Sequence, residues 1–538
     1  MKAEYSAITG RLYVMFDSWE EAQVYSKKWK WNVRKSEFPS IHLEDTLVNR
    51  IILKLPIADV AEPVAQVAVD GLLDFQVGDV QKLSALGTAL NRCDMGLGKT
   101  IEALACFRQM GLHTGIVFTK KSCITQWCRA INKWVPGARV FAYEDTKQKE
   151  KLPRISEVDF IVTNYDKLVG AYDKRGKIRI PILNRFGEYL CQRRWDMIIA
   201  DEAHIICNKD TARHVCIDKL PSRYRQALTG TPIKNHPDNL YGILHWLDPR
   251  WVGQSYWTFV DYFCKVDEHN PWGRKILGLT TDVDKVNVLR DLLNRISVYH
   301  AFDEVMPTDK FSISEQTFSV DMEPKQKKLY ENICNLVCEE LPDNMPILNG
   351  MVQTIRCQQV ATCPKIVGEK DWGPKFSFIS DWLQSSPDIR LTVFSPWATT
   401  CTYLCRYLDE VGISNTRVTG QLSTKVRNEN LRKFLGKEVR VLCATIGSIG
   451  TGTDGLQEVC NYGLFIEKDW SPEEMKQAAK RLYRIGQKKP VFIGHLEAVD
   501  TIDEKVGRVN IQKMKDVKKL LSTSGRVERG EYREYHLF

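Results

Sequence analysis

The sequence predicts an α/β protein with two parallel-sheet lobes, a helical insertion and a small N-terminal domain. The first observation is a recurring pattern in which a short apolar strand ends in a polar cluster and a helix follows. The second is a glycine-rich turn, DMGLGKT at residues 94–100, between a strand-like stretch and an apolar helix. Such alternation is typical of open parallel sheets, which bind ligands at the carboxyl ends of their strands.

Length and composition agree with several ordinary globular domains. The 538 residues, 43% of them hydrophobic and 27% charged, are enough for about three to four domain-sized units. The net charge of +9 favours a polyanionic partner. The 16 cysteines are scattered through apolar segments, which favours reduced thiols in a cytosolic or nuclear compartment. Because neither a long apolar run nor a signal-peptide core is found, we expect no membrane partner and a cytoplasmic location.

Changes in periodicity divide the chain into five expected segments. Strands and helices alternate in two regions, whereas the region between them is aromatic-rich and mainly helical. The expected segments are 1–65, a small N-terminal accessory domain; 66–250, the first lobe; 251–370, the helical insertion and crossover; 371–510, the second lobe; and 511–538, a C-terminal tail.

The N-terminal segment carries a short stretch in which basic and aromatic residues alternate. A strand is predicted at Arg11–Phe16, and Ser18 can cap a helix that runs through Tyr25. The stretch that follows suits a nucleic-acid surface, but a solvated helix end with two core tryptophans is equally consistent with it. This N-terminal basic cluster consists of Lys27, Lys28, Trp29, Lys30, Trp31, Arg34 and Lys35.

The glycine-rich turn has the composition of a P-loop, whose backbone N–H groups wrap nucleotide phosphates. Gly96 and Gly98 remove side chains where the backbone must approach an anion closely. A helix that begins at Lys99 would direct its positive end toward the phosphates. Lys99 is then placed for the β- and γ-phosphates, and the Thr100 hydroxyl for Mg²⁺. The strict pattern has glycine at position 93, where this chain has Cys93.

The expected cofactors are therefore ATP and Mg²⁺, and a glutamine upstream of the turn extends the site. Gln76 precedes the P-loop by about one helix, and its amide can both accept from and donate to an adenine edge. The predicted nucleotide-binding residues in this lobe are Gln76, Asp94, Met95, Gly96, Leu97, Gly98, Lys99 and Thr100.

A pair of carboxylates follows an apolar strand about a hundred residues after the P-loop. The strand Met197–Ala200 ends directly in Asp201 and Glu202. In a parallel sheet this end faces the P-loop end, so we expect Asp201 to bind Mg²⁺. Glu202 is then the expected general base, which orients and deprotonates the attacking water.

The second lobe lacks a P-loop and offers arginines instead. Gln477, Arg481 and Arg484 fall near i, i+4 and i+7, which would place them on one face of a helix. An arginine supplied across a cleft stabilises charge on a transferring phosphoryl group. We therefore expect Arg481 and Arg484 to be catalytic and Gln477 to help bind the nucleotide.

Taken together, these motifs resemble superfamily two helicases and, within them, the Swi/Snf-like ATPases. The resemblance covers about residues 70–510 and includes the strand end Phe394–Trp397. Its most specific parts are DMGLGKT at 94–100, LTGTPIKN at 228–235 and RIGQ at 484–487. The other matching motifs are Gln76, QW at 126–127, TNYDKL at 163–168, DEAH at 201–204, Thr445–Asp454 and QAAKRLYRIGQ at 477–487.

The resemblance implies two RecA-like lobes that close on ATP and move along double-stranded or branched DNA. It implies catalytic roles for Lys99, Thr100, Asp201, Glu202 and the two arginines. The loop at Thr445–Trp470 is slightly long, and Asp454 replaces a usual asparagine, so contacts there differ from the pattern. The residues implied to contact DNA are Lys120, Gln126, Trp127, Thr163, Asn164, Tyr165, Thr229, Ser395, Trp397 and Thr445.

The expected function is ATP-driven movement along duplex DNA, and short insertions favour a compact repair, fork-remodelling or viral enzyme over a chromatin remodeller. For a viral enzyme the location would be the host cytoplasm or nucleus. The alternatives are a strand-separating DNA or RNA helicase, a non-catalytic DNA-binding scaffold and a P-loop small-molecule kinase. A zinc site at Cys334, Cys338, Cys357 and Cys363 is a weaker alternative to a buried helix face.

Overall fold

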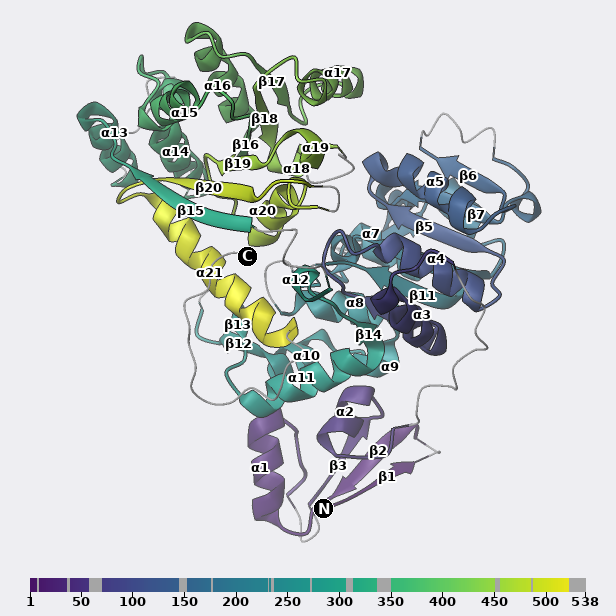
Figure 1. Cartoon of the computed structure of the whole chain (residues 1–538). Helices are drawn as coiled ribbons and strands as arrows, with labels where there is room; N and C mark the ends of the chain where they lie inside the picture. Colours follow the sequence, from purple (N-terminus) through teal and green to yellow (C-terminus); the bar gives the residue numbers. More distant parts are fainter. Residues whose placement is uncertain are drawn as a thin grey trace. The chain divides into compact units, whose positions relative to one another are not determined.

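The structure is a computed structural model whose chain forms two compact units (Figure 1). The first contains the described parts of residues 1–305 and the end of the last helix, and the second those of residues 306–515. The structure describes all residues except 7–8, 36–38, 58–69, 145–151, 176–177, 231, 234–236, 271–272, 306–312, 336–349, 450–454, 485–486 and 522–538.

A parallel sheet organises the first unit. Within the described residues it has seven strands in the order β14-β4-β11-β10-β5-β7-β6. All neighbouring strands pair in parallel, so their carboxyl ends meet at one edge. The strands are β4 (Ala89–Asn91), β5 (Gly115–Thr119), β6 (Val140–Tyr143), β7 (Phe160–Asn164), β10 (Trp195–Asp201), β11 (Ser222–Leu228) and β14 (Ser297–Val298).

Helices cover both faces of this sheet. On one face α3 (Asp74–Leu86), α4 (Lys99–Gln109) and α5 (Ile124–Trp134) pack side by side (Figure 1). The other face packs Ile116, Phe118 and Ile198 against residues of the remaining helices. Those helices are α6 (Arg185–Leu190), α7 (Ala212–Asp218) and α8 (Asn239–Leu247), and short 3₁₀ turns lie at η1 (Lys121–Cys123), η3 (Ile155–Glu157), η4 (Tyr165–Leu168) and η5 (Ala203–Ile206).

The N-terminal residues form a small antiparallel sheet with two helices. Ser18 caps the first helix by accepting a hydrogen bond from the Glu21 N–H at 3.1 Å, which confirms the predicted cap. The helix continues past Tyr25 to Trp29. The elements are β1 (Lys2–Ser6), β2 (Arg11–Met15), α1 (Trp19–Trp29), β3 (Ser40–Glu44) and α2 (Leu47–Ile52).

Four residues of the N-terminal basic cluster contact other parts of the protein. Trp29 and Trp31 are buried, and the Trp31 indole donates to the Tyr262 hydroxyl at 2.6 Å. Lys28 pairs with Asp284, while Lys30 lies 2.8 Å from Glu268 and also pairs with Asp261. The expectation of a nucleic-acid surface is therefore corrected for these four residues, because acidic side chains far along the chain neutralise the lysines.

Residues 251–305 belong to the first unit. Its last strand, β14, joins the parallel sheet, so the expected single insertion over 251–370 is corrected. Two small hairpins also belong to this unit, β8 (Val169–Arg175) with β9 (Ile178–Leu183) and β12 (Cys264–Asp267) with β13 (Lys275–Leu279). The remaining helices are α9 (Pro249–Val252), α10 (Tyr256–Phe263), α11 (Val283–Ile296) and α12 (Phe302–Val305).

The second unit is built on its own parallel sheet. Its described strands, six in number, are ordered β15-β20-β19-β16-β18-β17. Together the two sheets confirm the predicted α/β fold with two RecA-like lobes. The second sheet begins far upstream of residue 371, the expected start of this lobe. Its strands are β15 (Ile313–Val320), β16 (Leu391–Ser395), β17 (Asn415–Val418), β18 (Val441–Thr445), β19 (Tyr462–Phe465) and β20 (Val491–Ala498).

The helices of the second unit follow the expected alternation with strands. Helices α13 and α14 lie in the region that the sequence predicts to be mainly helical. The helices are α13 (Pro324–Cys334), α14 (Gly350–Thr362), η6 (Pro364–Val367), α15 (Pro374–Ser385), α16 (Ala398–Glu410), α17 (Thr424–Leu435), α18 (Ile446–Ile449), α19 (Leu456–Val459), α20 (Pro472–Ala479) and α21 (Ile502–Leu521).

The structure bears on the alternative of a zinc site and on the expected lack of a membrane span. The Sγ atoms of Cys334 and Cys357 lie 3.4 Å apart between α13 and α14, Cys363 is buried, and Cys338 lies outside the described residues. Among described residues these cysteines form no metal-binding group. No helix in the described part of the chain has the length and apolarity needed to cross a membrane.

Candidate nucleotide site and nucleic-acid interface

The P-loop connects β4 to the first turn of α4, as the sequence predicts. Gly96 and Gly98 have φ angles of 87° and 85°, a region that favours glycine. A Cβ on Gly98 would also lie 2.5 Å from the Gln76 side chain. The half-buried Asp94 is held by the segment after β14, since its N–H donates to the His300 carbonyl and its carboxylate accepts from the Phe302 N–H. Contacts with neighbouring segments therefore determine the path of the loop, and its backbone angles and close packing require glycine.

The donors of the P-loop fit a bound phosphate chain. Within the described residues, the backbone N–H groups of residues 96–100 make no hydrogen bond to the protein. The Lys99 ammonium donates to the carbonyls of Cys93 and Asp94, at 2.8 and 3.1 Å. Those two oxygens occupy the acceptor role that phosphate oxygens would take. Thr100 lies half-buried in the first turn of α4, where its hydroxyl is available to a cation.

Gln76 contacts the P-loop itself. Its amide oxygen accepts from the Leu73 N–H at 3.0 Å, and its amide nitrogen donates to the Leu97 carbonyl at 2.9 Å. The side chain is only 2% exposed. In this structure Gln76 thus supports the loop, and only one amide hydrogen is left for the expected two-way pairing with adenine.

The acid pair lies at the carboxyl end of β10, where the sequence predicts it. The Asp201 carboxylate accepts from the Thr119 hydroxyl at 2.7 Å and from the Trp127 indole at 2.8 Å. The Tyr165 hydroxyl donates to the Asp201 carbonyl at 2.6 Å. Residues from β5, α5 and η4 therefore fix both the side chain and the backbone of Asp201.

Glu202 follows in a left-handed backbone conformation, with φ 53° and ψ 51°. This uncommon geometry for a non-glycine residue turns the chain sharply and lets the next residues form η5. One Glu202 carboxylate oxygen lies 3.3 Å from Nδ1 of His204. The imidazole is thus within ion-pair distance of the carboxylate, and neither of these two buried atoms makes a hydrogen bond within the described residues.

The two carboxylates differ in their tendency to ionise. Burial, with a further contribution from Glu202, raises the pKa of Asp201 above its ordinary value. Burial acts in the same direction on Glu202, but His204 and the charges of Lys120 and Lys99 outweigh it and lower the pKa of Glu202. Glu202 is therefore the more readily ionised member of the pair.

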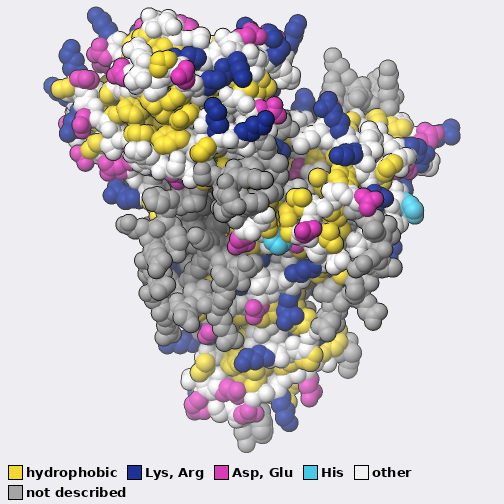
Figure 2. Space-filling view, in the orientation of Figure 1, with side chains coloured by type: hydrophobic (Ala, Val, Ile, Leu, Met, Phe, Trp, Pro, Cys, Tyr) yellow, Lys and Arg dark blue, Asp and Glu magenta, His cyan; other side chains and the backbone are white. Residues whose placement is uncertain are grey.

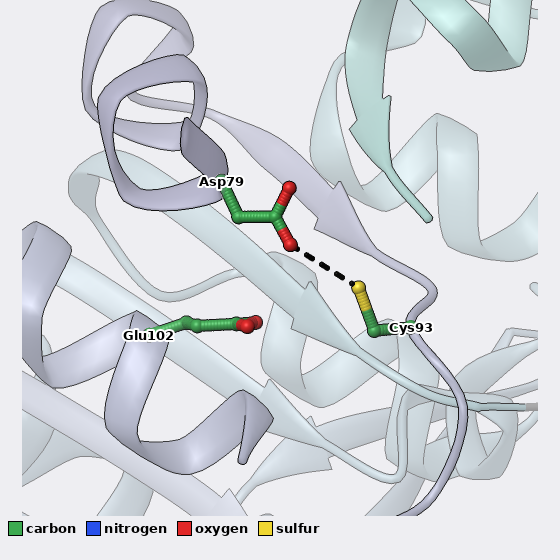
Figure 3. Close-up of side chains that lie close together, drawn as sticks. All are labelled: Asp79, Cys93 and Glu102. Carbon is green, nitrogen blue, oxygen red and sulfur yellow. Dashed lines mark hydrogen bonds between the residues drawn. The ribbon is translucent and has the colours of Figure 1, made fainter. Parts of the chain in front are cut away.

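A buried cluster of three ligand-type side chains lies behind the P-loop (Figure 3). Asp79 from α3, Cys93 and Glu102 from α4 converge, with their ligand atoms within 4.8 Å of one another. The Cys93 thiol donates to Asp79 at 3.5 Å, and Asn91 donates to Glu102. Burial raises the pKa of Cys93 and raises that of Glu102 to about 7. These hydrogen bonds tie α3 and α4 to the loop, and burial favours the protonated forms of Cys93 and Glu102.

Sequence reasoning missed this network for a physical reason. Cys93 was noticed only as a departure from glycine, and its partners lie 14 residues before it and 9 residues after it in sequence. A glutamate on the buried face of an otherwise apolar helix was the one available signal.

Several residues expected to contact DNA are buried. In the first unit Trp127 and Tyr165 hold Asp201, and the Thr163 hydroxyl donates to the Tyr143 carbonyl at 2.9 Å. Thr229 is also buried, and its N–H donates to the Asn91 carbonyl. The expectation of a side-chain contact is corrected for these four residues, because all four side chains are buried.

The same correction applies to the second unit. Ser395 is buried and donates to Glu467, and Thr445 is buried and donates to the Ser448 hydroxyl at 2.7 Å. Trp397 is half-buried at the start of α16 and keeps part of its ring accessible. Of the DNA-contact residues expected in this unit, only Trp397 has a substantially accessible side chain.

The accessible residues of the first unit gather near the ends of β5 and β7. Gln126 is exposed, while Lys120 and Asn164 are half-buried. A cavity of about 570 Å³ opens here, and the buried Asn164 amide oxygen makes no hydrogen bond within the described residues. The lining residues are Lys121, Asn164, Asp166, Lys167, Val169, Gly170, Ala171 and Asn184.

The arginines of the second unit do not share a helix face. Helix α20 ends at Ala479, so Gln477 is helical and buried, whereas Arg481 and Arg484 lie in the turns that follow. The expected i, i+4, i+7 arrangement is therefore corrected. The turn forms because the N–H groups of Arg481 and Tyr483 bond back to the carbonyls of Ala478 and Ala479.

Surface charge offers no single dominant patch on the face drawn in Figure 2. Lys and Arg side chains are distributed over the coloured surface of each unit, among acidic and hydrophobic ones.

The two parallel-sheet lobes, the P-loop and the acid pair define a P-loop protein of the helicase-like, two-lobed class. Residues 88–362 match the family model of the SNF2-related domain, and residues 374–486 match the helicase conserved C-terminal domain. Because the first match covers just over half of the 538 residues, the chain belongs to the SNF2-related family.

Curated relatives are 22–24% identical to this chain over the aligned residues. The human SWI/SNF-related matrix-associated actin-dependent regulator of chromatin subfamily A member 1 is 24% identical over 77% of this chain and 40% of its own length. The ISWI chromatin-remodeling complex ATPase ISW1 of Saccharomyces cerevisiae is 23% identical over 78% and 38%. The DNA repair and recombination protein RAD54-like of Drosophila ananassae is 22% identical over 82% and 60%. The chain thus spans about two fifths of the human and yeast relatives.

Among solved structures, the Sulfolobus solfataricus SWI2/SNF2 ATPase core in complex with dsDNA is similar at 20% identity. That match covers 88% of this chain and 100% of the archaeal chain, with a TM-score of 0.38.

Proposed function

We propose that this chain is an ATP- and Mg²⁺-dependent motor that moves along duplex DNA and acts on forked or branched DNA. The observation that carries the proposal is the fixed acid pair at the end of β10, in the same sheet whose strand β4 leads into the P-loop. Buried groups hold Asp201 in place, and Glu202 is ionised at neutral pH. Such preorganisation is what phosphoryl transfer to water requires.

Each residue of the first unit then has a defined role. The N–H groups of residues 96–100 and Lys99 bind the β- and γ-phosphates, for which Lys99 leaves its present carbonyl partners. Thr100 and Asp201 hold Mg²⁺, which neutralises charge that develops on the phosphates. Glu202 orients the attacking water and accepts its proton. Gln76 keeps the loop in shape through its bonds to Leu73 and Leu97.

The second unit is proposed to contribute Arg481 and Arg484 to the transition state. A guanidinium presents a planar fork of donors that matches two phosphate oxygens. Gln477, which is buried in α20, is better suited to hold the turn that carries these arginines than to contact the nucleotide directly.

The proposed DNA surface consists of accessible groups near the ends of strands in each unit. Lys120, Gln126 and Asn164 lie near the cavity in the first unit, and Trp397 follows β16 in the second. Cationic side chains at such an edge bind phosphates without reading sequence. The printed names of the relatives, which refer to chromatin and DNA repair, favour DNA over RNA. A motor of this kind would work in the cytoplasm or nucleus, wherever its DNA is.

One experiment separates this proposal from its rivals. Steady-state ATP hydrolysis is measured without nucleic acid and with single-stranded DNA, duplex DNA or RNA. The proposal predicts the strongest stimulation by DNA that contains duplex. Stimulation by RNA alone would favour a strand-separating RNA helicase, and hydrolysis with no response to any nucleic acid would favour a small-molecule kinase-like enzyme. An inactive chain that still binds duplex DNA would be a scaffold.

A further inference from the structure

A pair of cysteines in the second unit takes no part in the proposed motor chemistry. The Sγ atoms of Cys334 and Cys357 lie 3.4 Å apart, although 23 positions separate the two residues in sequence. Cys334 is the last residue of α13, and Cys357 lies within α14. Both are free cysteines, of which Cys334 is exposed and Cys357 only 4% exposed. An accessible thiol thus lies directly against a buried one.

Hydrogen bonds at both ends of the helix pair hold the two thiols in this arrangement. The Gln353 amide of α14 donates to the carbonyls of Ile333 and Cys334, both at 2.9 Å. Near the start of α13, the Gln326 amide donates to the Val360 carbonyl at 2.7 Å. Apolar side chains of both helices pack around the buried thiol between these bonds. Because the helices are fastened at two places, the two sulfur atoms remain neighbours.

The chemistry that suits two such thiols is formation of a disulfide. A disulfide needs an S–S distance of about 2.05 Å, and rotation of the exposed Cys334 side chain at the helix end can supply the remaining approach. A structural zinc ion takes four ligands, and among the described residues this pair belongs to no group of three metal ligands. Cys405 and Cys443 also interact in this unit, but both are buried. Of these two pairs, only the first presents a sulfur atom to an oxidant in solution.

We propose that Cys334 and Cys357 form an oxidative modification site that takes a hydroperoxide as its substrate. Cys334 reacts first, because oxidation of a thiol by a dissolved oxidant depends on its exposure and its thiolate character. Burial raises the pKa of Cys357 to about 12, so this residue stays a protonated thiol and serves as the resolving partner. The site goes beyond the proposed motor function and does not depend on it.

The reaction consists of two balanced steps. The Cys334 thiolate attacks one oxygen of hydrogen peroxide, so that an S–O bond forms and the O–O bond breaks. The sulfur loses two electrons and becomes a sulfenic acid, while the departing hydroxide takes up a proton to give water. The Cys357 sulfur then attacks the sulfenic sulfur, so that the S–S bond forms, the S–O bond breaks and the hydroxide leaves as water with the thiol proton. Two thiols and one peroxide thus give one disulfide and two waters.

The disulfide joins α13 to α14 and constrains the unfolded chain between them, which stabilises the folded state. The same helix pair is bonded to the start of α21, where the Tyr330 hydroxyl accepts from the Ile502 N–H at 2.7 Å. Oxidation should therefore raise the unfolding temperature. It should also keep Cys334 in a reversible state, because a sulfenic acid that meets no thiol is oxidised further to sulfinic and sulfonic acids.

The test exposes the full chain, first completely reduced, to hydrogen peroxide in small molar excess. Peptide mapping under non-reducing conditions locates disulfides, and dimedone labels sulfenic acids. The variants are Cys334→Ser and Cys357→Ser. The matched control is Cys191→Ser, which removes another exposed thiol. Circular dichroism confirms that each reduced variant is folded and follows its thermal unfolding before and after oxidation.

The wild type and Cys191→Ser are expected to form a disulfide between Cys334 and Cys357 that dithiothreitol reverses, and to unfold at a higher temperature once oxidised. Cys334→Ser should form no disulfide at Cys357. Cys357→Ser should carry a dimedone label at Cys334 and gain no unfolding temperature on oxidation.

Three results in the wild type would overturn the proposal. One is oxidation of Cys334 to sulfinic acid while Cys357 stays a free thiol. The second is a reduced Cys334 in a chain whose Cys191 is already oxidised. The third is a disulfide from Cys334 to any other cysteine. None of these readouts requires ATP hydrolysis, so a failure here and a failure of the motor proposal are distinguished.

Discussion

Trp127 donates its indole N–H to the carboxylate of Asp201 at 2.8 Å, and this bond connects the tryptophan to the acid pair at the end of β10. Trp127 is 2% exposed on the inner face of α5. The motif that contains it had suggested a DNA contact, but the side chain points the other way. A residue one position earlier, Gln126, is exposed and remains available to a ligand.

We predict that Trp127→Phe lowers the turnover rate about tenfold or more and raises the Mg²⁺ concentration needed for half-maximal rate. One hydrogen bond to a carboxylate is lost, and such bonds contribute about 1.5–3 kcal/mol. Duplex DNA affinity should be unchanged. Gln126→Ala serves as the control. It should lower duplex DNA affinity and leave the turnover rate and the Mg²⁺ dependence unchanged. A loss of DNA affinity in Trp127→Phe with normal Mg²⁺ dependence would contradict this assignment.

Lys99→Ala should abolish hydrolysis and weaken ATP binding, because the β- and γ-phosphates lose their cationic partner. Fluorescent-nucleotide binding and phosphate release are measured together. Lys121→Ala, which removes an exposed lysine at the start of η1, should keep near-normal ATP affinity. Near-normal turnover by Lys99→Ala would contradict the proposal that this loop binds the nucleotide.

Glu102 should make stability depend on pH. Burial raises the pKa of Glu102 from 4.5 to about 7, so the folded chain keeps a proton that the unfolded chain has lost. Stability from this group is complete below about pH 4.5 and is lost as pH rises to about 7, at about 1.4 kcal/mol per pH unit. The total is about 3 kcal/mol.

Glu102→Gln removes this titration while it keeps an acceptor for Asn91. The variant should therefore unfold at a higher temperature than the wild type at pH 8, and the two should agree closely near pH 4.5. Thermal unfolding at both pH values measures the difference. If Glu102→Gln shifted the unfolding temperature equally at both pH values, the effect would come from packing and not from the ionisation of Glu102.

Arg484→Ala should reduce single-turnover hydrolysis by about 10³–10⁵-fold, the loss seen when such arginines are removed from phosphoryl-transfer sites. Arg484→Lys should not restore the rate, because a point charge lacks the planar fork. ATP affinity is measured in parallel and should survive, since the first lobe supplies the main ground-state contacts. A large loss of affinity with unchanged chemistry would make Arg484 a ground-state ligand.

The parts of the fold that local sequence determines were predictable. Strand Met197–Ala200, the helix start at Lys99 and the Ser18 cap each depend on neighbouring residues, and the structure agrees with all three. Burial at strand ends was not predictable, because Thr163 and Asn164 are the last two residues of β7, yet Thr163 is buried and Asn164 is partly exposed.

Ion pairs between residues far apart in the sequence were also not predictable. Lys30 is separated by more than 230 residues from the acids that neutralise it, and no pattern in the chain connects them. The second-lobe helix ends at Ala479 although its periodicity continues to Arg484, because backbone bonds in the following turn compete with the helix. The β8–β9 hairpin escaped notice since its short strands carry charges that resemble a loop.

The most direct test of the central claim is displacement of a third strand from a DNA triplex. A labelled triplex-forming strand on a long duplex is removed only by a motor that travels along the duplex. We predict displacement that requires ATP and Mg²⁺, leaves the two duplex strands paired and is absent in Glu202→Gln, which should still bind ATP. Separation of the duplex strands, or no displacement despite DNA-stimulated hydrolysis, would contradict movement along duplex DNA.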